Sequence, residues 1–503
     1  MKLNNNNNLS DITGISNVNI GKIELDSVNQ YTIRPDFTAP FCQGILANTV
    51  NVEDIINNKK VYVEEICENV SDKGLWLSFF HKKGELLKLS NLDQWLSIDE
   101  VANINNKNIS NADLPSSTMN LSSLFTLNAS NNNLTEVGFL LGLEKVRGDL
   151  LLNGNPLANL NGLEDLEEVT GIINLSNTGI TDTSQLSNLR MVGRLDLSGN
   201  PSITDLSGIE NIEKGLEIYL NEPTQYELID FTSPFCFEMS RGLVVPIVKS
   251  TSRRIYITEI CNGVPNDAKW LNYLQSQGQL IGFTDLSDWE RNDVTATMAS
   301  KSLTVGDIPS ARMPTTQIYS LNFSNNLLSN ISFLNLVEVV REELNFNNNR
   351  INNIAGLGRL QKIKNLKLSN NDIESLDRME EINEINYLNL SYNPNLDDIS
   401  ILRNVSGTLE LRINNTAIPT LVPIENFNSL IYLDISNTPL NDISPLANLT
   451  PNTVIMKNPL ELEIKPDFNS QFCQAYYNKL INVTYNGSDA VSYTHLRAHE
   501  TKK

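Results

Sequence analysis

The residues near the carboxyl terminus have the types and the spacing of a metal site. His495 and His499 are four residues apart in the stretch HLRAHE, and Glu500 follows the second histidine directly. Residues four apart share one face of a helix, so two imidazoles and a carboxylate there would suit zinc or general-base chemistry. Whether this stretch counts as a site depends on the rest of the chain.

The stretch Val491 to Thr501 is similar to the in-frame translation of an adapter used to build sequencing libraries. We therefore interpret residues 491–503 as a non-native tail and predict neither a metal site nor a cofactor. Without the tail, His81 is the only histidine, and a histidine triad or a histidine-rich metal site cannot be built from one such residue. The sequence predicts that the chain is not an enzyme and that His81 is a partly exposed residue on a helix.

Four of the five cysteines form two equally spaced pairs. Cys42 and Cys67 are 25 residues apart, as are Cys236 and Cys261. Two disulfides would indicate an oxidising compartment, whereas buried free thiols would fit a reducing cytosol. The equal spacing favours disulfides. Position 498, where a partner for Cys473 is expected, lies inside the tail, so we interpret the odd cysteine as a trace of truncation.

The composition excludes some classes of partner. The 503 residues carry 38 basic and 59 acidic side chains, a formal net charge of −21. Such a surface repels nucleic acid and anionic lipid, so we predict no nucleic-acid partner. No apolar run reaches the length of about 18 residues that a membrane helix needs, so we predict no membrane span.

A repeat with a period near 22 residues fills two stretches of the chain. Its motif, L-x-L-x-x-N-x-L, recurs in LFTLNASNNNL, GDLLLNGNPL, GIINLSNTGI and GRLDLSGNPSI, and a second block runs from Leu321 to Met456. The paired apolar residues are predicted to face the core, because alternate strand residues point to opposite faces. The next polar position is predicted to satisfy turn backbone groups, through Asn132, Asn155, Asn200, Asn326, Asn349, Asn371 and Asn393 and through Thr178, Thr416 and Thr438.

This pattern resembles the leucine-rich repeat. The segments ITDLSGIENI and LNDISPLANLT are similar to the short convex segments of the 22-residue bacterial class found in internalins. The resemblance implies an α/β fold, a leucine-rich repeat solenoid with a curved parallel sheet, in tandem blocks separated by modules that contain cysteine and tryptophan.

A larger repeat of 194 residues sets the predicted domains. Trp76 and Trp95 recur as Trp270 and Trp289, and each module is predicted to carry one helix packed by its tryptophan. The predicted domains are the end of a truncated leucine-rich block (1–30), an inter-block module (31–115), a block (116–225), a second module (226–310), a longer block (311–461), the start of a third module (462–490) and the tail. Because the chain begins within a coil, we expect sequence upstream of it.

The remaining candidate site is a strip of polar residues on the concave face of the sheet. It comprises Asn128, Asn174, Asp196, Asn322, Asn345, Lys367, Asn389, Arg412 and Asp434, with Tyr387 and Tyr432 beside them. Polar rows on a rigid sheet suit recognition of a protein or glycan, although the asparagines could merely solvate the sheet. We expect a secreted or cell-surface adhesion or receptor-like protein; the alternative is an intracellular scaffold that regulates a partner enzyme.

Overall fold

The computed structural model describes the chain except for residues 7, 406–408, 428, 458–460, 486–487 and 491–503. The interpretation of the tail, including the His495 and His499 pair, therefore lies outside the described residues. The chain divides into two compact units, Met1–Val264 and Pro265–Lys503. This division falls inside the segment predicted as the second module, and the other predicted domain boundaries stay predictions.

Most of the regular structure is short strands, one or two to a coil. The first unit contains β1 (Gly21–Leu25), β2 (Val50–Asp54), β3 (Lys59–Val61), β4 (Val101–Asn103), β5 (Ser123–Leu124), β6 (Thr126–Asn128), β7 (Lys145–Val146), β8 (Leu150–Leu151), β9 (Glu168–Asn174), β10 (Met191–Asp196), β11 (Lys214–Leu220), β12 (Ile229–Asp230), β13 (Val244–Val248), β14 (Arg253–Arg254) and β15 (Cys261–Asn262). The second unit contains β16 (Thr295–Thr297), β17 (Gln317–Asn322), β18 (Val339–Asn345), β19 (Lys362–Lys367), β20 (Glu384–Asn389), β21 (Leu409–Arg412), β22 (Leu430–Asp434), β23 (Thr453–Met456), β24 (Asn482–Tyr485) and β25 (Ser488–Ala490).

The helices belong to the segments between the repeat blocks. They are α1 (Pro40–Leu46), α2 (Val63–Ile66), α3 (Asp72–Lys82), α4 (Trp95–Ile98), α5 (Pro234–Ser240), α6 (Ile257–Ile260), α7 (Asn266–Ser276), α8 (Ser287–Arg291) and α9 (Gln471–Tyr477). The expectation of one helix per module was therefore wrong, although α3 and α7 lie where that helix was predicted. The proline at the start of α1 and α5 explains the omission, because it suits a first helical turn but also a loop.

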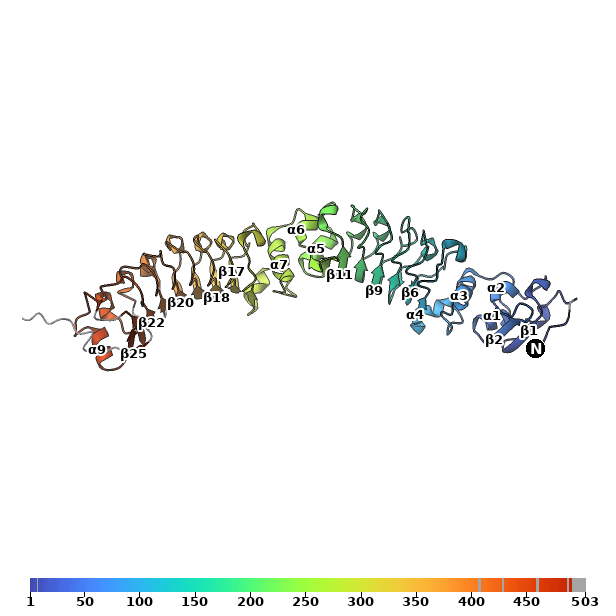
Figure 1. Cartoon of the computed structure of the whole chain (residues 1–503), viewed down its shortest axis with the longest axis horizontal. Helices are drawn as coiled ribbons and strands as arrows, with labels where there is room; N and C mark the ends of the chain where they lie inside the picture. Colours follow the sequence, from blue (N-terminus) through green and yellow to red (C-terminus); the bar gives the residue numbers. More distant parts are fainter. Residues whose placement is uncertain (7, 406–408, 428, 458–460, 486–487, 491–503) are drawn as a thin grey trace, which may run out of the picture. The chain divides into compact units, whose positions relative to one another are not determined.

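The strands of each block form one sheet in the order of the chain. In the first unit β4, β6, β8, β9, β10, β11 and β13 are parallel neighbours, and β14 pairs antiparallel with β13. In the second unit β16 to β24 are parallel neighbours and β25 closes the sheet antiparallel (Figure 1). Near the start of the chain β1 and β2 are also parallel neighbours, and β3 pairs antiparallel with β2. Each repeat block thus ends on a strand and an antiparallel partner supplied by the following module.

The core has the composition that the repeat predicts. The paired leucines are buried, as at Leu150, Leu152, Leu195 and Leu197. Burial of such side chains contributes about 1.5–3 kcal/mol each relative to exposure. Because every coil presents the same two inward positions, the coils stack into a continuous apolar column within each unit.

The predicted asparagine ladder is confirmed. Asn200 Nδ2 donates to the carbonyl oxygens of Leu175 and Leu197, both at 2.9 Å, and its Oδ1 accepts from the backbone nitrogens of Thr178 at 3.0 Å and Gly179 at 2.8 Å. Leu197 belongs to the same coil as Asn200, whereas the other three partners belong to the coil before it. One buried amide therefore fastens two consecutive coils. Thr178, which occupies the ladder position of the preceding coil, makes one hydrogen bond to a backbone carbonyl, from Oγ1 to Leu175 at 2.8 Å.

The tryptophans pack the modules in the same way in both copies. Trp76 Nε1 donates to the Ser117 carbonyl at 2.9 Å and Trp270 Nε1 donates to the Ala311 carbonyl at 2.8 Å, each 41 residues further along the chain. Both indoles are fully buried. An indole N–H loses its water on burial and needs such an acceptor. The equivalence confirms that the 194-residue repeat is a structural repeat.

His81 differs from its prediction. It is buried on α3 and not partly exposed, with Nε2 3.0 Å from the Leu86 carbonyl oxygen. Its counterpart, Gln275 on α7, donates from Nε2 to the Phe283 carbonyl at 2.8 Å. Both side chains thus satisfy a carbonyl in the loop after the helix. The sequence could not show this, because burial of the polar face of α3 depends on that loop folding back.

Candidate functional site

The predicted concave residues lie in register on adjacent strands. In the second unit one row of Cα partners runs through Asn322, Asn345, Lys367, Asn389, Arg412 and Asp434. In the first unit Asn128 and Asn174 both pair with Leu151, and Asp196 follows Asn174. A second row, two residues earlier, holds Tyr387, Glu410 and Tyr432. The strands therefore bring together side chains that are 22 or more residues apart in the chain.

Most of these amides and carboxylates hold the turn that follows their own strand. Oδ1 accepts the backbone N–H two residues further on at Asn128, Asn174, Asp196, Asn322, Asn345, Asn389 and Asp434. Where the residue two positions further on is serine, its hydroxyl often donates to the same oxygen, as Ser198 does to Asp196 at 2.5 Å. Asp196 and Asp434 are buried. These residues build the sheet edge through local turns, a role that short polar side chains commonly take.

At two positions of the row the side chain has no oxygen that could accept a hydrogen bond from the following turn. Lys367 and Arg412 cannot accept a hydrogen bond, and both instead lie against tyrosine rings. The Lys367 Nζ is 5.8 Å from the centroid of Tyr387, and the Arg412 guanidinium carbon is 5.7 Å from Tyr387 and 4.5 Å from Tyr432. Cation and aromatic ring thus alternate across β19, β20, β21 and β22. We call Lys367, Tyr387, Arg412 and Tyr432 the tyrosine stack.

The two cations of the tyrosine stack differ in their charge partners. Lys367 Nζ forms an ion pair with Glu343 at 2.6 Å. Within the described part of the chain Arg412 forms no ion pair, and its buried Nε has no hydrogen-bond partner. Burial raises the pKa of Tyr432, and the adjacent Arg412 charge opposes that rise. A half-buried guanidinium between two rings, without an ion pair to a described residue, is suited to receive a carboxylate.

A comparable cluster in the first unit is internally paired. Arg194 Nε donates to Glu217 at 2.7 Å, and Lys249 Nζ lies 3.2 Å from Asp196 and 3.9 Å from the centroid of Tyr219. Sequence reasoning missed this cluster, apart from Asp196. The signal was available at Tyr219, which lies between two inward residues as the other concave residues do. Lys249 comes from the module after the block, where the periodicity stops.

The predicted disulfides are confirmed. Cys42 is bonded to Cys67 and Cys236 to Cys261, with Cα atoms 6.2 and 6.1 Å apart. Each joins a helix of the module, α1 or α5, to the residue that follows α2 or α6. Cys473 occupies the equivalent place on α9 as a buried free thiol. Cross-links at these positions tie the chain together where a repeat block ends.

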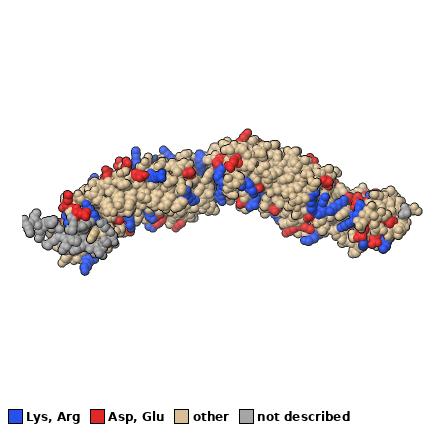
Figure 2. Space-filling model, viewed as in Figure 1, with Lys and Arg blue, Asp and Glu red and all other residues tan. Residues whose placement is uncertain are grey.

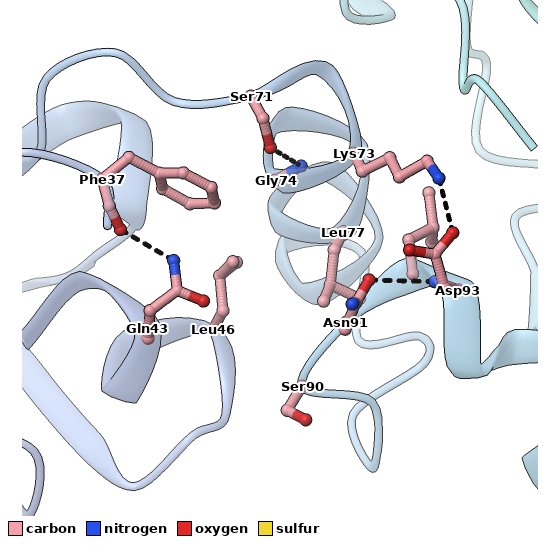
Figure 3. A pocket seen from close by; sticks show the side chains of 11 residues that line it. Phe37, Gln43, Leu46, Ser71, Lys73, Gly74, Leu77, Ser90, Asn91 and Asp93 are labelled. Atoms are coloured by element: carbon pink, nitrogen blue, oxygen red, sulfur yellow. Dashed lines mark hydrogen bonds and ion pairs between the residues drawn. The ribbon is translucent and has the colours of Figure 1, made fainter. Parts of the chain in front are cut away.

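The first unit also contains a hollow of about 220 Å³ between α1, α3 and the residues near α4 (Figure 3). Its polar groups are engaged with each other. Lys73 Nζ lies 2.5 Å from Asp93, the Asp93 backbone nitrogen donates to Asn91 at 3.0 Å, and Gln43 donates to the Phe37 carbonyl at 2.7 Å. Because these partners satisfy one another, we assign no ligand to this hollow.

Figure 2 shows basic and acidic side chains interspersed on the face in view. Among the described residues no three histidine, cysteine or carboxylate side chains are grouped to hold a metal ion. Within the same residues no helix has the length and apolar character to cross a membrane. The tyrosine stack is therefore the candidate site with the most specific chemistry.

The repeated coil, its inward leucines and its buried asparagine ladder define a leucine-rich repeat protein. No family model and no curated protein matches the chain. Among solved structures, an internalin from Listeria monocytogenes is similar at 17% identity over 73% of this chain and 81% of its own, with a TM-score of 0.25. A leucine-rich repeat protein from Leptospira interrogans is similar at 16% identity over 72% of each chain, with a TM-score of 0.25.

The leucine-rich repeat ectodomain of a membrane receptor kinase from Arabidopsis thaliana is similar at 14% identity over 72% of this chain and 44% of its own, with a TM-score of 0.24. That ectodomain was solved in complex with Casparian strip integrity factor 2. Likeness at this level carries no argument about function.

Proposed function

We propose that the chain is a non-enzymatic recognition protein that binds a protein partner on its concave sheet, at the tyrosine stack. The alternation of Lys367, Tyr387, Arg412 and Tyr432 across four strands carries this proposal. Tyrosine and arginine are the residues that most often contribute large binding energies at protein interfaces. Here they lie on a rigid sheet, so little conformational entropy is lost when a ligand binds.

Arg412 determines the character of the partner. Its charge is the one in the tyrosine stack without an ionic partner among the described residues, and its Nε is an unsatisfied buried donor. An acidic side chain of the partner would supply the missing opposite charge to the half-buried guanidinium, whose enclosed Nε takes no part in the contact. The proposed partner is therefore a protein segment that presents a carboxylate to the Arg412 guanidinium.

The disulfides support a secreted or cell-surface location. Cross-links of this kind persist in oxidising compartments and are rare in the cytosol. Non-reducing peptide mapping of the chain purified from its own source tests this part. Linked Cys42–Cys67 and Cys236–Cys261 peptides are expected; free thiols throughout would instead favour the intracellular scaffold.

Recognition itself can be tested with a random peptide library displayed on phage and selected on the immobilised chain. Recovered peptides should be rich in aspartate or glutamate and should lose at least about tenfold in affinity on Arg412→Ala, which corresponds to about 1.4 kcal/mol. Arg194→Ala is the matched control, because Arg194 is also stacked on a tyrosine but is paired with Glu217. Peptides that bind both variants as well as the wild type would refute the proposal.

A further inference from the structure

The residue just before each ladder position adopts a left-handed backbone. In the second unit this position is occupied by Asn325, Asn348, Asn370, Tyr392, Asn415 and Asn437, with φ between 54° and 58°. Asparagine tolerates this conformation better than other side chains, because it can hydrogen-bond locally. Tyr392 is the exception in the series. It retains a strained backbone where its neighbours have the residue that suits it.

The asparagines of this series form a second, exposed ladder. Asn348 Nδ2 donates to Asn325 Oδ1 at 2.7 Å, and Asn370 Nδ2 donates to Asn348 Oδ1 at 2.9 Å. Beyond Tyr392 the ladder resumes, with Asn437 Nδ2 donating to Asn415 Oδ1 at 3.2 Å. All these bonds have the same direction along the sheet edge. An asparagine at position 392 would therefore connect the two segments.

Tyr392 interrupts the ladder and leaves two unused amide groups beside it. Asn370 Oδ1 is an acceptor and Asn415 Nδ2 is a donor, and within the described residues neither has a protein partner. The tyrosine side chain is 55% exposed and makes no ring or cation contact with any described residue. A strained backbone at an exposed aromatic residue whose ring has no aromatic or cation partner among the described residues points to a role in function.

We infer that Tyr392 and the two flanking amides form a glycan-binding site at the sheet edge, distinct from the tyrosine stack. An exposed ring offers a flat face to the C–H side of a sugar. A sugar hydroxyl both donates and accepts, so it matches an acceptor on one side and a donor on the other. The two amides belong to coils two strand spacings apart, about 9–10 Å, which leaves room for one sugar ring over the tyrosine.

The residues near this site favour a neutral carbohydrate over a protein. Two residues after Asn370, Tyr392 and Asn415 come Asp372, Pro394 and Ala417, and the one charge among them, on the exposed Asp372, is negative and disfavours an acidic sugar. The protein-binding residues proposed on the concave face, by contrast, are cations between rings. A glycan at Tyr392 does not require the proposed function to hold, since no residue is shared with the tyrosine stack.

Tyr392→Asn separates binding from stability. Because it restores asparagine to the left-handed position and completes the amide ladder, the variant should melt about 2 °C higher than the wild type. Tyr392→Phe keeps the ring and should keep most of the glycan binding. Arg412→Ala leaves the edge unchanged and should bind glycans as the wild type does, so a failure of the proposed function would not affect this result.

The probe is an array of neutral oligosaccharides, applied to the full chain and to the three variants. Binding by the wild type that falls at least tenfold in Tyr392→Asn, together with its higher melting temperature, is the expected result. The inference is overturned if no oligosaccharide binds, if Tyr392→Asn binds equally well, or if that variant is less stable than the wild type. Loss of binding in Arg412→Ala would place the glycan on the tyrosine stack instead.

Discussion

Replacement of Asn200 by alanine should be among the most destabilising single changes in the first unit. The side chain is fully buried and makes four hydrogen bonds of 2.8 to 3.0 Å with backbone groups. Alanine removes all four and leaves the buried Thr178 N–H and the part-buried Gly179 N–H without acceptors. A typical protein hydrogen bond contributes about 1 kcal/mol net, so the loss should be about 4 kcal/mol.

Threonine at the same position should cost less. Thr178, Thr416 and Thr438 occupy the equivalent position in other coils, and each donates from Oγ1 to a carbonyl of its own coil at 2.6 to 2.8 Å. Asn200→Thr therefore keeps one of four bonds and should lose about 3 kcal/mol. The control is Asn188→Ala. Asn188 is exposed and donates once, to the Glu164 carbonyl at 2.7 Å, so its loss should stay within about 0.5 kcal/mol.

Urea unfolding of the full chain gives the overall loss, and hydrogen exchange followed by mass spectrometry locates it. Peptides that contain the Thr178 and Gly179 amides should exchange faster in Asn200→Ala, because these N–H groups lose the acceptor that protects them. Equal exchange of these amides in wild type and Asn200→Ala, or equal unfolding of Asn200→Ala and Asn188→Ala, would refute the role given to the ladder.

Three further outcomes follow from the modules. Joint replacement of Cys42 and Cys67 by alanine should lower the free energy of unfolding by about 3.5 kcal/mol, the chain-entropy value for a loop of 25 residues, measured by urea titration. Burial lowers the pKa of His81 below its ordinary value of 6.5. The stability that the neutral imidazole contributes is therefore fully present above about pH 6.5 and is lost as the pH falls through the lowered pKa. His81→Gln carries the residue found at Gln275, and its urea midpoint should not fall in this way between pH 7.5 and pH 5. Burial raises the pKa of the Cys473 thiol, so native chain should react with iodoacetamide far more slowly than chain unfolded in urea, and equal rates would contradict this assignment.

The coil could be predicted from the sequence because its determinants are local. Leu195, Leu197 and Asn200 lie within six residues, and alternation along a strand already assigns the leucines to the core and the asparagine to the turn. The disulfides could also be predicted from the sequence, since the equal spacing in two copies specified the pairs. These features follow from short-range geometry repeated many times.

The interactions between coils were harder to predict from the sequence. The concave row was predicted, but that its asparagines hold their own turns and that Arg412 lies between Tyr387 and Tyr432 depends on the register of neighbouring strands. The left-handed backbone of Tyr392 could not be predicted, because the sequence of an asparagine-rich chain does not show which of its asparagines adopt that conformation. His81 was misjudged because its burial depends on a loop that closes over α3.

The ladder amides also determine how the chain can change in length. Asn200 binds its own coil and the coil before it, and Asn371 does the same through the carbonyls of Leu368 and Phe346. Each coil therefore presents the same backbone groups on both sides, so a whole coil can be gained or lost without leaving a buried donor unpaired. The concave sheet can thus be lengthened in steps of about one strand spacing, 4.8 Å, while the residues proposed to recognise a ligand stay on the coils that carry them.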